Sequence, residues 1–253
     1  TRRQRQMCIR DSIIGIILTG LLGFILERTF LRPMVGEPVF SVAVLTIGID
    51  ILLRVVLDNW IGINPKYMGD PFPSYGNFGS LNIGGLTVKY LEVTALITSL
   101  ILISILSVFF KRSKYGVAMR ATSLDQEAAL AQGINVGRVF GLVWFIAGLL
   151  AAFAGFFITG GFNTLTNTSF ISALRALPAV VIGGLDSITG AIIGSLIIGL
   201  TQAYVGYYQF DIESAYNIKL GNGFSIVAPY LIMFVILLVK PHGLFGTEEV
   251  ERV

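Results

Sequence analysis

Long apolar runs separated by short polar segments dominate the pattern of this chain. A helix needs about 20 apolar residues to cross a hydrocarbon core of about 30 Å. Stretches that meet or approach this length are residues 13–31, 39–57, 91–110, 139–159 and 224–239. The pattern predicts an all-α polytopic membrane protein with about five full transmembrane helices and one further, broken apolar region.

The broken region covers residues 172–207, where Pro178, Gly183, Gly184 and Asp186 interrupt an otherwise apolar run. Residues 172–185 would form a helix of only about 21 Å, which is too short to cross. We interpret the region as a half-depth helix followed by a full span, an arrangement tolerated where the backbone is buried in protein or lines a cavity. The alternative is a pair of helices joined by an ordinary tight turn.

Composition supports the membrane assignment and narrows the chemistry. The chain is 54% hydrophobic and 13% charged, whereas soluble domains run at about 45–50% and about 25%. A single Cys8 and a single His242 leave no disulfide framework, no cysteine or histidine metal cluster and no embedded catalytic histidine. We therefore predict no catalytic residue, no metal site and no cofactor.

Lysine and arginine predict the orientation. If the C-terminal end of the first span is cytoplasmic, nine basic residues lie inside and three outside, in accord with the positive-inside rule. The inner set is Arg28, Arg32, Lys111, Arg112, Lys114, Arg120, Arg138, Lys240 and Arg252, and the outer set is Lys66, Lys89 and Lys219. The later segments agree with this orientation only if residues 172–207 enter the membrane from the outside and return to the outside. The same orientation places the tail, residues 247–253, in the cytoplasm.

Residues 1–12 oppose this charge rule, because Arg2, Arg3, Arg5 and Arg10 fall on the outer side. The segment has no apolar core and is not a signal peptide. We interpret it as a non-native leader, with a natural basic leader as the alternative.

The cytoplasmic loop, residues 111–138, carries a helix signal. Ser123 followed by Gln126 is a capping box that predicts a short helix over residues 123–132, and Gly133 can end it. The helix has a small, apolar face and is too short to be stable alone. It either docks into a groove on a partner or lies on the membrane as a connector.

The spans also contain polar candidates. Asp50 and Arg54 lie four residues apart, so they can neutralise each other, either as a polar site on the translocation path or as a structural pair. Arg175 can snorkel outwards or meet a substrate carboxylate. In the external loop, residues 59–90, alternation around Gly84 and Gly85 predicts a small β-hairpin.

Small residues recur at helical spacing in two later spans, where they permit close helix approach in lipid. They are Gly148, Ala151, Ala152 and Gly155 in one span, and Gly190, Gly194 and Gly199 after the break. We expect them to build the bundle around a path.

Motifs spread along the chain resemble one family. Glu127-Ala128-Ala129 followed by Gly133 has the EAA-xxx-G spacing of ABC-importer permeases, and residues 116–139 as a whole resemble the branched-chain amino-acid permease family of the LivH type. Other resembling segments follow the same order: Glu27-Arg28 with Arg32-Pro33, Thr46-Ile47-Gly48, residues 181–191 and residues 240–246. The match is collinear over residues 13–246.

The resemblance implies a permease domain over residues 13–246 that forms a translocation path in a bacterial inner plasma membrane. Implied partners are ABC ATP-binding subunits, a companion LivM-type permease, an external substrate-binding protein and the lipid bilayer, with no nucleic acid. Glu127, Ala128, Ala129 and Gly133 are then the residues expected to couple to the ATPase. Family members begin with a further span and half-helix, so we expect this chain to be N-terminally truncated.

The chain contains no GxxxxGK[ST] loop, so it cannot cradle ATP itself and is not predicted to be an enzyme. Branched-chain or related amino acids are the expected substrates. Alternatives are an ABC permease for another small solute, such as urea or an aromatic acid, and an ion-coupled secondary transporter. An intramembrane enzyme lacks support, because no paired aspartates, HExxH motif or serine–histidine arrangement occurs.

Overall fold

The computed structural model describes residues 2–34, 39–62, 64–67, 80–83, 86–162, 164–165, 173–174, 176–184, 187–216, 221 and 223–246. The chain divides into two compact units, Thr1–Ser169 and Phe170–Val253. Each unit is described by itself.

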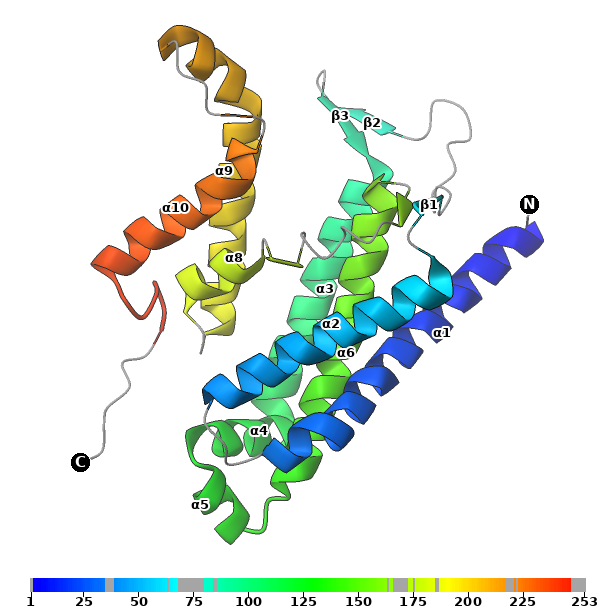
Figure 1. The fold of residues 1–253 in the computed structure, drawn as a ribbon, viewed down its shortest axis with the longest axis vertical. Helices are drawn as coiled ribbons and strands as arrows, with labels where there is room; N and C mark the ends of the chain where they lie inside the picture. The colour runs from blue at the N-terminus through cyan, green and yellow to red at the C-terminus, as the bar shows by residue number, and fades with distance from the viewer. Residues whose placement is uncertain are drawn as a thin grey trace. The chain divides into compact units, whose positions relative to one another are not determined.

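Four long helices form the first unit (Figure 1). They are α1 (Arg2–Leu26), α2 (Val39–Ile61), α3 (Tyr90–Arg112) and α6 (Val136–Phe162). A π-helical turn, Glu27–Leu31, and a 3-10 turn, Arg32–Met34, extend α1. All four contain a window long and apolar enough to cross a membrane, which confirms four of the predicted spans.

The principal packing inside this unit is α1 against α6, and it depends on glycine. A Cβ on Gly23 would overlap the Trp144 carbonyl, and a Cβ on Gly148 would lie 3.0 Å from the Gly20 Cα. The two backbones can approach this closely only because side chains are missing at the crossing. The prediction for Gly148 is confirmed, whereas Gly155 has open space where its Cβ would be.

Short strands join the loops at one end of the unit. β2 (Ser80–Ile83) and β3 (Leu86–Lys89) are antiparallel, with Ile83 opposite Leu86, so the predicted external hairpin is confirmed. β1 (Lys66–Tyr67) pairs with β4 (Thr164–Leu165), a long-range pairing that the sequence pattern does not predict. The cytoplasmic-loop helices α4 and α5 lie at the opposite end of the unit (Figure 1), as the predicted topology requires.

The second unit contains α8 (Ala176–Gly183), α9 (Ile188–Tyr216) and α10 (Phe224–Val239). Its buried core is Ala179, Ile182 and Ile198, against which side chains of α10 pack. α9 is the fifth helix long enough to span, whereas α10, one of the predicted spans, has 16 residues. The expected all-α, polytopic class with a small hairpin is confirmed.

Helix α1 begins at Arg2, so it includes residues 2–12. The interpretation of residues 1–12 as a non-native leader stays a prediction.

Candidate functional site

The loop at residues 111–138, predicted to be cytoplasmic, contains two helices rather than one. α4 (Lys114–Leu124) begins at a Ser113 cap, whose hydroxyl accepts from the Gly116 N–H, and α5 (Gln126–Ala131) follows after a single residue. The predicted capping box at Ser123 is wrong, because Ser123 lies in the last turn of α4 and its hydroxyl donates to the Arg120 carbonyl. The cap of α5 is Asp125, whose carboxylate accepts from the Ala128 N–H at 2.9 Å.

Gly133 ends α5 as predicted. Its φ is +80°, its N–H donates to the Leu130 carbonyl, and the Ile134 N–H reaches back to the Ala129 carbonyl. This pair of bonds is a Schellman closure, which favours glycine at the left-handed position. Asn135 then caps the next helix by accepting from the Arg138 N–H, so the chain turns from α5 into α6 within four residues.

α5 is held on one side and exposed on the other. Ala129 is 3% exposed, and Met119 and Thr122 of α4 and Val136 of α6 are also buried. α4, α5 and α6 contact one another. Glu127, Ala128 and Gly133 are exposed. Leu124, at the end of α4, is 88% exposed, and Leu130, in α5, is 57% exposed. An anchored helix with exposed leucines is a surface suited to an apolar groove.

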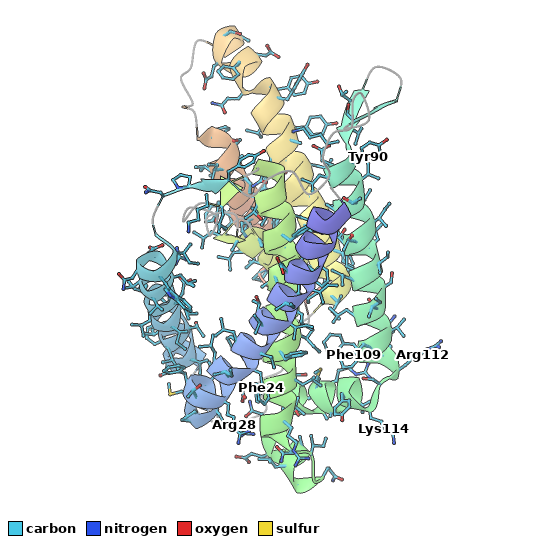
Figure 2. The ribbon with its side chains drawn as sticks, turned by 90° about the vertical axis from the view of Figure 1, so that its right-hand side faces the viewer. Phe24, Arg28, Tyr90, Phe109, Arg112 and Lys114 are labelled. Atoms are coloured by element: carbon cyan, nitrogen blue, oxygen red, sulfur yellow. The ribbon has the colours of Figure 1, made fainter. Side chains whose placement is uncertain are left out.

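Basic residues surround this end of the unit. Figure 2 shows Arg112 and Lys114 where α3 meets α4, and Arg28 at the same end of α1, with Tyr90 at the far end of α3. Lys111 and Arg112 occupy the last turn of α3, where cations also complement the helix dipole.

The structure brings Asp50 and Arg54 together on α2. The Arg54 Nε–H donates to Asp50 Oδ2 at 2.9 Å, and Nη2 lies 2.6 Å from the same oxygen. The predicted mutual neutralisation is confirmed. Because a charged pair is costly against hydrocarbon, this face of α2 requires protein or water beside it.

The broken helix is closed by contact between backbones. α8 ends at Gly183, and α9 returns so closely that a Cβ on Gly183 would overlap the Gly190 carbonyl and one on Gly194 would overlap the Ala179 carbonyl. The small-residue prediction is confirmed for Gly190 and Gly194, whereas Gly199 faces open space.

Pro178, predicted as part of the interruption, lies within the first turn of α8 and is fully buried. A proline there leaves no hydrogen bond unmade, because the first helical N–H groups have no intrahelical partner. The interruption itself comes at Gly183 and Gly184. The predicted site residues Arg175 and Asp186 lie outside the described residues.

The segment after α10 completes the break. The N–H groups of Leu244 and Phe245 donate to the carbonyls of Ile182 and Gly183 at 2.8 and 3.1 Å. These carbonyls end α8 and would otherwise lack partners. Residues about 60 positions downstream therefore cap the half-helix.

Glu27 was identified from the sequence only as part of a motif, and its burial against α6 was not predicted. An acidic side chain at the end of a span normally reaches water. The sequence signal for its burial is the glycine pair Gly137 and Gly141, four residues apart in α6, which permits close packing there. In the part of the chain that the structure describes, no three His, Cys, Asp or Glu residues gather as a metal site.

Comparison with known proteins is decisive for the family. Residues 2–239 match the model of the branched-chain amino acid transport system / permease component family. The chain belongs to this family. It is a multi-pass membrane permease component.

Individual relatives agree over nearly the whole chain. All three named here are high-affinity branched-chain amino acid transport system permease proteins. BraD of Pseudomonas aeruginosa is 26% identical over 98% of this chain and 77% of its own length. LivH of Salmonella typhimurium is 30% identical and LivH of Escherichia coli 29% identical, with the same shares of 98% and 77%. No solved structure matches.

Proposed function

We propose that this permease forms part of the substrate path of an ATP-driven importer in a bacterial inner plasma membrane. In this proposal α5 docks on an ATP-binding subunit, a companion LivM-type permease completes the path, and an external binding protein delivers the substrate. Branched-chain or related hydrophobic amino acids are the proposed substrates, in line with the names of the relatives.

One observation carries the proposal: Ala129 of α5 is buried and α5 contacts α4 and α6, while Leu124 and Leu130 stay exposed. A six-residue helix is unstable alone, so its packing on α6 makes it a rigid projection. Because α4 follows α3 and α6 follows α5, force on this projection reaches two spans. Glu127, Ala128, Ala129 and Gly133 are the proposed coupling residues.

The docking surface is tested by charge insertion. The permeases and ATP-binding subunits of the transport system are co-expressed with a tag on one ATP-binding subunit, and Leu124→Glu/Leu130→Glu is compared with wild type. We expect at least a tenfold loss of co-purified permease, because two carboxylates cannot enter an apolar groove without partners.

Tyr115→Glu is the matched control, since Tyr115 is an exposed residue at the start of α4 and lies on the opposite helix face from Leu124. It should co-purify as wild type does. Equal recovery of the Leu124→Glu/Leu130→Glu variant and wild type would contradict docking through α5.

Transport is tested in proteoliposomes that contain the whole complex and an added binding protein. Uptake of labelled leucine should require internal ATP and should persist when ion gradients are collapsed. Dependence on an ion gradient instead would favour a secondary transporter. Uptake of urea or an aromatic acid in preference to leucine would reassign the substrate while leaving the importer mechanism intact.

Asp50 and Arg54 are proposed as polar groups on the path, together with Arg175. Asp50→Asn removes the ion pair of Arg54 with Asp50 within a span, where a charged group costs about 3 kcal/mol on insertion scales, so membrane insertion should fall. Asp50→Asn/Arg54→Gln should restore insertion. If uptake stays low in this double variant although insertion is normal, the pair acts on the path; if uptake recovers fully, the pair is structural.

A further inference from the structure

Glu27 is the one fully buried acidic or basic side chain in the part of the chain that the structure describes. It is 2% exposed, and its Oε1 has no hydrogen-bond partner among those residues. Buried carboxylates are normally paired or hydrogen-bonded, so an orphaned oxygen at this depth requires an explanation.

The backbone around Glu27 explains its position. Residues Glu27–Leu31 form a π-helical turn, in which the Arg32 N–H donates to the Glu27 carbonyl. In an α-helix, residues five apart point in directions about 140° apart, whereas a π-turn closes at this spacing and brings them close to the same side. The wider turn therefore aligns Glu27 with Arg32.

Both side chains lie against the same helix. A Cβ on Gly141 of α6 would lie 3.2 Å from Glu27 Oε2, and a Cβ on Gly137 would lie 2.9 Å from Arg32 Cζ. Gly137 and Gly141 are separated by about one helical turn. The carboxylate and the guanidinium therefore sit on neighbouring turns of a side-chain-free strip of α6.

Other basic side chains at this end are placed differently. Arg28 and Arg138 are exposed, whereas Arg32 is half-buried. Within the described chain no ion pair joins Glu27 to any of them. Arg32 is the cation whose head group already lies on the α6 strip beside Glu27.

The strip is the part of α6 that directly follows the coupling loop. α5 ends at Ala131 and α6 begins at Val136, so Gly137 and Gly141 belong to its first two turns. Any displacement of α5 enters α6 at this point. With no side chain at either glycine, the two charged groups rest directly on the α6 backbone, so a shift of α6 changes the surroundings of both.

The geometry points to Glu27 as a positioning residue for transport coupling: Glu27 and Arg32 form a latch on the first turns of α6, open as seen here. Displacement of α6 by the coupling loop lets the carboxylate pair with the guanidinium. Because both residues lie on the segment that extends α1, the ion pair fixes the end of α1 in the conformation that matches the shifted α6. In the closed state, Glu27 Oε1, which has no partner here, accepts a hydrogen bond from the Arg32 guanidinium. This inference rests on the proposed function.

The test measures leucine taken up per ATP hydrolysed by the reconstituted whole complex, with the amount of assembled complex measured separately. Glu27→Gln has nearly the same shape but cannot form the ion pair. We expect normal assembly and ATP hydrolysis, with at least a tenfold fall in uptake per ATP. Arg32→Gln should reproduce this fall, and Glu27→Gln/Arg32→Gln should be no worse than either single variant, because both residues serve one latch.

Arg28→Gln is the matched control, since Arg28 is the exposed neighbour, and it should retain wild-type coupling. Parallel loss of assembly and uptake in Glu27→Gln, with unchanged coupling in Arg32→Gln, would reduce Glu27 to a folding role and overturn the inference. Unchanged coupling in both variants would also overturn it. The proposed function is contradicted separately, by a wild-type complex that shows no ATP-driven uptake.

Discussion

The proposed coupling loop, residues 111–138, and the broken helix, α8 and α9, both reverse the chain at a glycine. The hydrogen bonds that complete the two turns come from different parts of the chain. At the coupling loop, α5 is capped by Asp125 before it and by Gly133 after it, all within nine residues. At the break, α8 is closed by glycine contacts with α9 and by N–H groups of Leu244 and Phe245 from beyond α10. The turn after α5 is formed by neighbouring residues alone. The turn after α8 requires α9 and residues 240–246 to be packed in place.

The difference shows how each region can respond to force. A locally capped helix can move as a piece while keeping its own hydrogen bonds. The break cannot move without disturbing α9 or residues 240–246. Within the proposed importer, we expect the coupling loop to shift as a rigid body and the break to stay fixed as a framework.

The largest expected effect comes from Gly183→Val. Its side chain would meet the backbone of Gly190, which cannot rotate away, so we expect destabilisation of about 3 kcal/mol and loss of folded protein from membranes. The measurement is monodisperse protein recovered in detergent after heating. Gly199→Ala, at a position with open space, should match wild type; equal melting of Gly183→Val and wild type would refute the close packing at the break.

A second comparison uses two of the glycines with positive φ, +80° at Gly133 and +79° at Gly243. Gly133 has open space, whereas a Cβ on Gly243 would lie 2.7 Å from the Val181 carbonyl oxygen and 2.8 Å from the Gly184 nitrogen. Alanine at either site should cost about 1–2 kcal/mol for backbone strain, and alanine at 243 should cost a further 1 kcal/mol or so from overpacking.

Asparagine separates the two causes, because it tolerates left-handed backbone better than most residues. Gly133→Asn should recover most of the stability lost in Gly133→Ala, as measured by thermal melting in detergent. Gly243→Asn should not recover. Recovery at both sites would mean that the segment after α10 does not pack on the break.

The smallest expected effect concerns the cap of α5. Asp125→Ala removes the acceptor for the Ala128 N–H and should cost about 1 kcal/mol, seen as faster proteolysis at the α4–α5 corner. Ser123→Ala should be neutral, since the Ser123 hydroxyl bonds only within α4. Faster proteolysis of Ser123→Ala than of Asp125→Ala would instead identify Ser123 as the cap of α5.

Features formed by neighbouring residues could be predicted from the sequence, whereas those that depend on distant residues could not. Gly133 was predictable because its closure spans only a few residues, and the spans were predictable from apolar length. The prediction of Ser123 as the helix cap was wrong because serine and aspartate are both good caps. Which of Ser123 and Asp125 caps α5 depends on where α4 ends. The role of Leu244 and Phe245 was hidden because their partners lie about 60 residues away. Glu27 was hidden because its burial depends on the glycine face of α6.

The length of α10 has a consequence for the surrounding lipid. Its 16 residues reach about 24 Å, less than the hydrocarbon thickness of about 30 Å. A helix of this length that begins at one boundary of the hydrocarbon core ends inside it, at a depth where water cannot satisfy peptide amides. The N–H groups of Lys240, Gly243, Leu244 and Phe245 all have backbone partners, so this segment can lie within the hydrocarbon layer in place of acyl chains.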